Sequence, residues 1–346
     1  MLVVTQTIFG EVDQKTIYSF TMENDQGMKV TAINYGCIIT SILVPDKKGT
    51  FEEVVIGHDT LDDYIQDSYF LGAVVGRVGG RIKGGSFILD GNTYTIPKNN
   101  QENHLHGGFK GFNKVVWDAE RLANGVRFSY FSPDGEEGYP GNLHILVTYT
   151  LDNQNQLNIH YEAHSDKKTL LTVTNHSYFN LSGNLKRDIQ QHALKIKSDR
   201  FLELNDEFIP TGKFLEVSNT PFDFRERRVI ETGITSDYHQ NILVGNGYDH
   251  PFILNTNHDT EIELKDPISG RILTMETDEV GVVLYSGNSI KAEGQFRDTP
   301  ARKYLGICLE TQGLPDAIHH PQFPTVVLDK DQKYSSKTNY TFGIER

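Results

Sequence analysis

Apolar and polar residues alternate with a period of two along most of the chain, and this pattern predicts a protein built from β-strands. Successive side chains of a strand point to opposite faces, so the alternation marks segments with one buried face. Turn-forming clusters such as Asp90-Gly91-Asn92 and Pro133-Asp134-Gly135 separate the segments. The clearest predicted strands are 31–35, 37–44, 87–89, 93–96, 126–131, 143–151, 157–164, 261–264, 271–277, 280–285, 304–310 and 326–328.

The sequence contains a clear start signal for only one short helix. Thr60 can cap it, with Asp63 three residues later and Tyr64 and Ile65 following. Many short strands separated by turns favour an all-β fold, either an antiparallel sandwich or a barrel. No repeat and no interior linker rich in Gly, Ser or Pro divides the chain, so we expect one large β domain over residues 1–346.

Charge and composition narrow the function classes. The net charge of −13 over 346 residues disfavours nucleic acid and anionic membranes as partners, since both need a basic surface. The first residues lack the basic and apolar regions of a signal peptide, and no run reaches the ~18 apolar residues of a membrane span. We therefore expect a cytoplasmic protein. Cys37 and Cys308 lie in apolar strands without CxxC spacing, which predicts reduced core thiols.

A carboxylate stands at the end of the predicted strand 304–310, directly before a turn rich in Gly and Pro. Tyr304, Gly306 and Cys308 share a strand face with Glu310. A side chain at a strand end is held rigidly and can still face a cleft, which suits a catalytic base. Taken alone, a solvated Glu at a strand end is the simpler interpretation.

Three further segments concentrate polar side chains: Asn-His-Leu-His-Gly-Gly at 103–108, Thr-Asn-His-Ser-Tyr-Phe-Asn-Leu at 174–181, and Gly-Tyr-Asp-His-Pro at 247–251. A His-x-His pair such as His104 and His106 can also ligate zinc or iron, if other segments supply the remaining ligands. No thiolate or His-x-x-x-His spacing accompanies the pair, so a metal site is the weaker interpretation. The sequence context of His250, His319 and His320 is that of packed or loop residues.

The glycine-rich segment 76–85 resembles a phosphate-binding loop only superficially. A dinucleotide fingerprint needs a helix directly after the glycines, whereas a strand and a turn follow here. We interpret the segment as a tight loop that presents Arg77 and Arg81. The fixed fork of donors on arginine suits sugar hydroxyls or a carboxylate. The alternative is that both arginines are ordinary surface residues.

Taken together, these segments resemble the aldose 1-epimerase (galactose mutarotase) family in their order along nearly the whole chain. The matching stretches are 76–82, 103–108, 132–141, 174–183, 247–251 and 308–324. The resemblance implies a large antiparallel β-sandwich, often called a supersandwich. It also implies interconversion of the α and β anomers of a free aldohexose, without a metal or organic cofactor.

The resemblance assigns roles to six residues. Glu310 would be the base at the sugar oxygen O1 and His176 the acid at the ring oxygen O5, and the two exchange roles on ring closure. Arg81, His106, Tyr178 and Asp249 would bind the sugar. We expect the negative charges of Asp249 and Glu310 to raise the pKa of His176.

Two departures from the family pattern bear on selectivity. Gly80 stands where members often have Asn, and Val283 where they often have Gln. We expect a small-molecule sugar partner, with both galactose and glucose as substrates and maltose as another free aldose to consider. A glycoside hydrolase that uses Asp249 with Glu310, a non-catalytic sugar-binding module or sensor, and a hexose 6-phosphate epimerase are the rival interpretations. The chain could act as a monomer or a homodimer.

Overall fold

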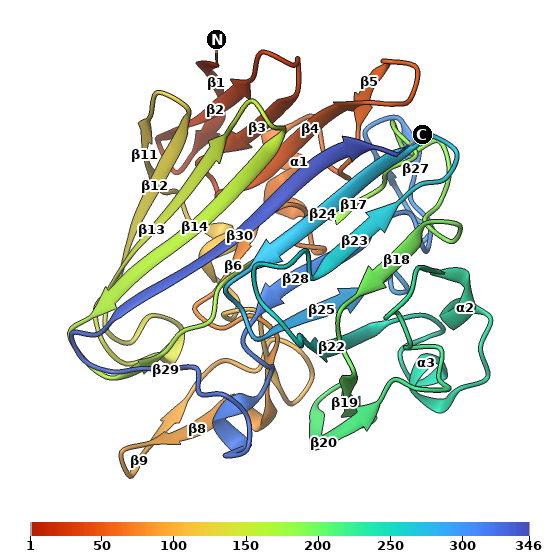
Figure 1. The fold of residues 1–346 in the computed structure, drawn as a ribbon. Coiled ribbons are helices and arrows are strands. Elements are labelled where there is room, and N and C mark those ends of the chain that lie inside the picture. Colours follow the sequence, from red (N-terminus) through yellow and green to blue (C-terminus); the bar gives the residue numbers. More distant parts are fainter. Residues whose placement is uncertain (1, 346) are drawn as a thin grey trace.

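The computed structural model describes residues 2–345, and antiparallel sheets dominate it (Figure 1). The expected all-β antiparallel fold is confirmed. The α-helices in this range are short: α1 (Leu61–Gln66), α2 (Glu231–Ile234) and α3 (His239–Leu243). Single 3₁₀ turns add Lys83–Gly85, Phe112–Lys114, Glu136–Gly138 and Ala317–His319. Among residues 2–345, no helix is both long enough and apolar enough to cross a membrane.

Three large sheets contain most of the strands. The nine-stranded sheet has the order β11 (Asp118–Arg121), β12 (Gly125–Ser132), β13 (Leu143–Leu151), β14 (Gln156–Ser165), β30 (Lys333–Ile344), β24 (Arg271–Thr277), β23 (Ile262–Lys265), β18 (Ala193–Ile196) and β21 (Arg228–Val229). The five-stranded sheet has the order β1 (Val3–Val12), β2 (Lys15–Glu23), β3 (Lys29–Ile33), β4 (Ile39–Pro45) and β5 (Phe51–Glu53). The six-stranded sheet has the order β17 (Tyr178–Phe179), β28 (Ile307–Gln312), β25 (Gly281–Tyr285), β22 (Asp249–Ile253), β19 (Arg200–Leu204) and β20 (Pro210–Glu216).

Five two-stranded ribbons complete the fold. They pair β6 (Val74–Val75) with β16 (Thr174–Asn175), β7 (Arg81–Ile82) with β10 (His104–Leu105), β8 (Ser86–Leu89) with β9 (Asn92–Thr95), β15 (Thr169–Leu170) with β29 (Val327–Leu328), and β26 (Gln295–Phe296) with β27 (Thr299–Pro300).

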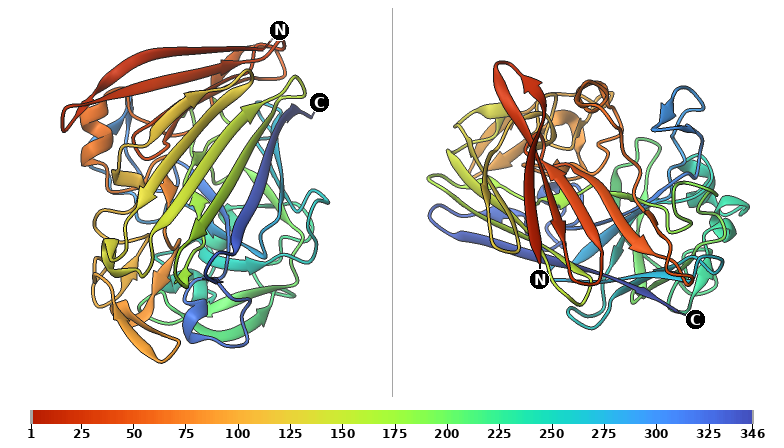
Figure 2. Two further views of the ribbon diagram at one scale, coloured as in Figure 1. Left: turned by 90° about the vertical axis from the view of Figure 1, so that its left-hand side faces the viewer. Right: turned by 90° about the horizontal axis from the view of Figure 1, so that it is seen from above.

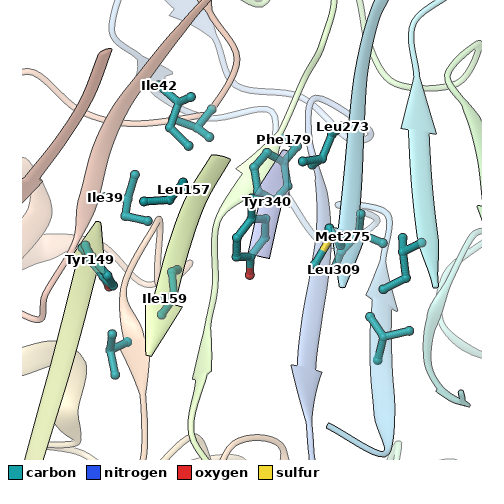
Figure 3. Packing of buried hydrophobic residues seen from close by; sticks show 14 of the residues in the cluster. Ile39, Ile42, Tyr149, Leu157, Ile159, Phe179, Leu273, Met275, Leu309 and Tyr340 are labelled. Carbon is teal, nitrogen blue, oxygen red and sulfur yellow. The ribbon is translucent and has the colours of Figure 1, made fainter. Parts of the chain in front are cut away.

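The nine-stranded sheet is the backing layer for the other two. Figure 3 shows Ile39 of β4 beside Leu157 of β14 on one half, and Leu309 of β28 beside Met275 of β24 on the other. The five-stranded sheet therefore covers one half of the backing layer and the six-stranded sheet covers the other half. In Figure 2 the red N-terminal hairpin β1–β2 lies across one end of the molecule.

Alternation along each strand explains this packing. The five odd-numbered residues of β13, Leu143 to Leu151, are all buried in the core, while the residues between them are at least partly exposed. Burying one such side chain stabilises the fold by about 1.5–3 kcal/mol. The core forms because many strands contribute their apolar face in this way.

Most predicted strands and the predicted helix are confirmed. The segments 143–151 and 271–277 match β13 and β24 residue for residue, and Thr60 accepts a hydrogen bond from the Asp63 backbone N–H at 3.2 Å as the cap of α1. Both cysteines are buried and free, as predicted. Strand β28 continues to Gln312, so the predicted strand end at Glu310 was two residues too early.

Candidate active site

Three neighbouring strands of the six-stranded sheet send one face to the core and the other to a cavity. Leu309 of β28 and Leu284 of β25 belong to the core, whereas their neighbours Glu310 and Val283 line the cavity. On β22, Asp249 faces the cavity in the same way. The period-two pattern that builds the core therefore also places the polar side chains on the opposite side of the sheet.

The cavity has a volume of about 310 Å³, which is within the usual range for small-molecule sites. Its walls come from the six-stranded sheet, from the start of β7, and from the loops after α1, β9, β10 and β19. All six site residues predicted from the sequence line it: Arg81, His106, His176, Tyr178, Asp249 and Glu310.

His176 and Glu310 meet at the floor of the cavity. His176 Nε2 lies 3.5 Å from Glu310 Oε1, and the two side chains are only 6% and 4% exposed. The antiparallel pairing of Tyr178 with Cys308 sets this approach, because each partner lies two residues from one member of the pair. An imidazole and a carboxylate this close can donate and accept a proton at neighbouring atoms of one small molecule.

Burial shifts the pKa values of the pair in opposite directions. Desolvation lowers the pKa of His176 to about 4, so the expectation of a raised value was wrong: loss of water outweighs the opposing charge of Asp67. Desolvation, reinforced by the charge of Asp249, raises the pKa of Glu310 well above its ordinary value. Burial therefore favours the neutral form of both groups.

The second ring nitrogen of His176 contacts a thiol. His176 Nδ1 lies 3.6 Å from Cys308 Sγ, and burial raises the pKa of this thiol well above its ordinary value. The thiol therefore stays protonated. With the ring proton on Nδ1, His176 donates to Cys308 Sγ, and Nε2 faces Glu310 as an acceptor. On the cavity side, the Phe70 ring packs 5.8 Å from the His176 ring, measured between centroids.

His106 is fixed as a hydrogen-bond donor. Its Nδ1 accepts the Gly80 backbone N–H at 3.1 Å, and burial lowers its pKa well below the ordinary value. A neutral imidazole whose Nδ1 is an acceptor carries its proton on Nε2. The ring packs 4.8 Å from Phe70 and 5.3 Å from His176, again between centroids.

Three side chains lie close enough together to be considered as metal ligands. One ligand-type atom from each of His106, His176 and Glu310 lies within 4.8 Å of the others. A cation bound at Nε2 of His106 would require that nitrogen to lose its proton, while Nδ1 still faces the Gly80 N–H. The donor set therefore fits hydrogen bonding and proton transfer better than metal ligation.

Arg81 and Asp249 form a charged pair nearer the mouth of the cavity. Arg81 Nη1 lies 3.8 Å from Asp249 Oδ2, and its Nε donates to Asn100 Oδ1 at 3.1 Å. The guanidinium also lies over the Phe208 ring, 5.3 Å from its centroid. Burial raises the pKa of Asp249 while Arg81 opposes the rise. The pair offers one donor and one acceptor at adjacent positions.

Tyr178 forms part of the cavity wall. Its ring lies 5.1 Å from the His176 ring and 5.9 Å from the Tyr285 ring, and the side chain is buried. Burial raises its pKa well above the ordinary value, so the phenol stays neutral.

Arg77 does not reach the cavity, and its prediction as a presented arginine was wrong. It is 3% exposed, and its guanidinium donates to Ser132 Oγ and to the backbone carbonyls of Pro140 and Gly141. Burial lowers its pKa to about 10, so it remains charged at neutral pH. Its function is to attach the 76–85 loop to the 132–141 segment.

His104 and His250 pack as structural residues. His104 Nδ1 lies 2.7 Å from the Pro97 carbonyl oxygen, and its Nε2 lies 2.7 Å from Tyr139 Oη. His250 is buried against Gln240, as its sequence context predicted.

Several cavity residues were not predicted from the sequence. Gln312 shares the strand face of Glu310, so the alternation that identified Glu310 could have found it. Phe70, Asn100 and Phe208 lie outside the strands of the structure and carry no local signal of function.

Comparison with known proteins connects this fold and cavity to a family. Residues 18–341 match the family described as aldose 1-epimerase. This chain belongs to that family. Galactose mutarotase of Rattus norvegicus is 40% identical, and the alignment covers 99% of this chain and 100% of the rat protein.

Two further relatives bear on fold and function. The crystal structure of galactose 1-epimerase from Lactobacillus acidophilus superposes with a TM-score of 0.89 at 31% identity and covers 100% of both chains. Maltose epimerase of Levilactobacillus brevis is 32% identical over 98% of each chain. The chain is therefore an isomerase whose reaction is the interconversion of aldose anomers.

Proposed function

We propose that this protein is a mutarotase for free D-galactose and D-glucose in which Glu310 and His176 act as an acid–base pair. The observation that carries the proposal is the 3.5 Å separation of His176 Nε2 and Glu310 Oε1 at the floor of the cavity. Anomer exchange needs a proton acceptor at O1 and a proton donor at O5, both within hydrogen-bond reach of the anomeric centre.

The reaction balances without a cofactor. The O1 proton moves to the Glu310 carboxylate, the O1 electron pair forms the carbonyl at C1, and the C1–O5 bond breaks. O5 takes a proton from His176. Rotation about C1–C2 turns the other carbonyl face to O5, and closure with the roles reversed returns both protons. No net proton or electron is gained or lost.

Besides the N–H of the neutral imidazole, the pair must hold one exchangeable proton. Burial favours this proton on Glu310, because it raises the carboxyl pKa and lowers the imidazole pKa. To act as the base, Glu310 passes the proton across the short gap to His176. Sugar hydroxyls that donate to the carboxylate favour its ionised form, so substrate binding prepares the pair for reaction.

The remaining cavity residues hold the sugar. His106 donates through Nε2–H, and the neighbouring Arg81 and Asp249 serve hydroxyls as donor and acceptor. Gly80 and Val283 add no polar side chain to the wall. We therefore infer weak discrimination at C4, where galactose and glucose differ.

Maltose is the second candidate substrate, because it has a free anomeric carbon. The relative named maltose epimerase supports it. The Phe208 ring beside Arg81 gives the cavity a further apolar surface on which a second sugar ring could pack.

Polarimetry on freshly dissolved α-D-galactose, α-D-glucose and maltose tests the proposal, with the unaided rate subtracted at the same pH. We expect the protein to accelerate the approach to anomeric equilibrium for galactose and glucose. Methyl α-D-galactoside is the control, because its O1 carries no proton and its rotation should not change. A glycoside hydrolase would release a reducing end from this control, and a sugar-binding module would bind sugars without accelerating any of them.

A further inference from the structure

Gln312 is a buried amide without a partner in the cavity wall. It is 1% exposed, and neither Oε1 nor Nε2 forms a hydrogen bond with any residue in the range 2–345. Leaving a buried donor or acceptor unpaired costs about 1–3 kcal/mol, so such a group in a native cavity requires an explanation. Gln312 lines the same cavity as Glu310, and the two lie on the same face of β28.

Two glycines, which have no side chain, make room for this amide. A Cβ added at Gly79 would lie 2.4 Å from Gln312 Oε1, and one at Gly80 would lie 3.3 Å from Nε2. A side chain at Gly79 would therefore displace the amide. The backbone of this segment packs closely on Gln312 but supplies it with no hydrogen bond, which leaves the cavity contents as the available partner.

We propose that Gln312 determines specificity by binding a sugar hydroxyl through its side-chain amide. The inference rests on the proposed function of the cavity as an aldose site. An amide offers an acceptor and a donor together, and a hydroxyl can both donate and accept, so the two groups match. Residues two apart on a strand are separated by about 7 Å, so the amide contacts a hydroxyl other than the anomeric one held by Glu310.

The contact also explains how this chain reads sugars without polar side chains at Gly80 and Val283. A hydroxyl paired with a buried amide is recognised strongly, because an analogue without it leaves the amide unpaired. Val283 opposes Glu310 in the β25–β28 register, and Gly281 opposes Gln312. On this part of the sheet, the polar contacts of the cavity therefore come from β28.

The test is the Gln312→Met variant, which keeps the side-chain length and removes the amide, assayed with galactose and its 2-, 3-, 4- and 6-deoxy analogues. We expect kcat/KM for galactose to fall about 10- to 100-fold. For one deoxy sugar, the variant and the parent protein should be within about twofold, because that sugar lacks the hydroxyl that the amide binds. Gln6→Met, at an exposed glutamine of β1, is the matched control and should change nothing.

A uniform loss for every sugar in the panel would overturn the proposal and assign Gln312 a purely structural role. If Gln312→Met does not fold, Gln312→Asn retracts the amide by one methylene and should give the same sugar-selective loss. Calorimetric binding of the same panel separates this claim from the catalytic one. Hydroxyl-dependent binding without turnover would overturn the proposed function alone, whereas turnover with uniform losses would overturn the Gln312 contact alone.

Discussion

At the scale of single residues, His176 and Glu310 are almost completely withdrawn from water, and their pKa values move as burial dictates. Loss of water disfavours the charged form of each group. The carboxyl gains affinity for a proton and the imidazole loses it, so one proton can pass between them. A solvated pair would hold each charge firmly and exchange a proton less readily.

The raised pKa of Glu310 predicts that this residue costs stability. A carboxyl whose folded pKa lies above its unfolded value stabilises the protein at low pH and loses that contribution as the pH rises through the folded value. Glu310→Gln should therefore raise the free energy of unfolding by about 0.5–2 kcal/mol at pH 8, with a smaller gain at pH 5. Thermal unfolding at both pH values measures this.

The control for this prediction is Glu226→Gln, at an exposed carboxyl, which should leave the unfolding temperature unchanged at both pH values. Destabilisation by Glu310→Gln at pH 8 would contradict the account, because it would mean that the buried charge is well compensated in the native state.

The sequence identified the six proposed site residues, but not the geometry that relates them. The approach of His176 to Glu310 depends on the pairing of β17 with β28, which joins segments that are far apart along the chain. The direction of the pKa shift of His176 was predicted wrongly. Sequence motifs can suggest which charged residues lie near a side chain, but they do not show how deeply that side chain is buried. Phe70 was missed because its contact with His176 is created by the fold alone.

At the scale of elements, short ribbons and loops hold the substrate-facing side chains above the sheet. The β7–β10 ribbon carries Arg81 and ends at His106, where the backbone turns into the left-handed region. Gly107 follows with a φ of +85°, and a Cβ there would lie 1.8 Å from the Gly76 carbonyl oxygen. This close approach fixes the position of the His106 ring.

Gly107→Ala should therefore impair activity through the position of His106. We expect kcat/KM for galactose to fall about 10²-fold, because the loop must move to relieve the clash. The matched control is Gly91→Ala, where φ is +78° and no atom lies within 4 Å of the added Cβ. Both variants lose about 1–2 kcal/mol to backbone strain. Equal activity of the two variants would show that the clash has no functional effect.

Strands with apolar faces were predictable, whereas strands held by hydroxyl contacts were not. β30 was missed although it is central in the nine-stranded sheet, because Ser336 and Thr338 occupy part of its buried face. Thr338 Oγ1 lies 2.9 Å from Thr277 Oγ1 and 2.7 Å from Thr311 Oγ1, so hydrogen bonds replace apolar packing there. The edge strand β1 was missed because most of its residues are exposed.

At the scale of the whole molecule, one sheet supports both the core and the cavity. The backing layer packs against the inner face of the six-stranded sheet (Figures 1 and 3). The cavity lies on the outer face of that sheet. Leu309 and Glu310 are adjacent in sequence and serve the two sides. Stability and chemistry are therefore coupled through single strands.

Buried histidines predict acid sensitivity of the whole fold. Burial lowers the pKa of His104, His176 and His192 to about 4 and that of His250 to about 3. An unfolded histidine titrates near ~6.5, so the native state binds fewer protons below that pH and stability falls as the pH drops from about 6.5 toward 4. Each such histidine contributes up to about 1.4 kcal/mol per pH unit in that window.

Urea unfolding at pH 7.5, 6.5, 5.5 and 4.5 measures this loss. The unfolding free energy should be nearly constant between pH 7.5 and 6.5 and then decline steeply. His239→Gln, at an exposed histidine of α3, should leave the profile unchanged. A flat profile down to pH 5 would mean that these rings are protonated or hydrated in the native state.

The most direct test of the account is polarimetry of α-D-galactose with Glu310→Gln, His176→Asn and the double variant, all confirmed as folded. The account predicts that each single substitution lowers kcat by about 10²–10⁴-fold. It also predicts that the double variant loses little more than the worse single variant, because the two groups act as one proton-exchanging pair. Near-normal turnover in either single variant would contradict the assignment of the pair.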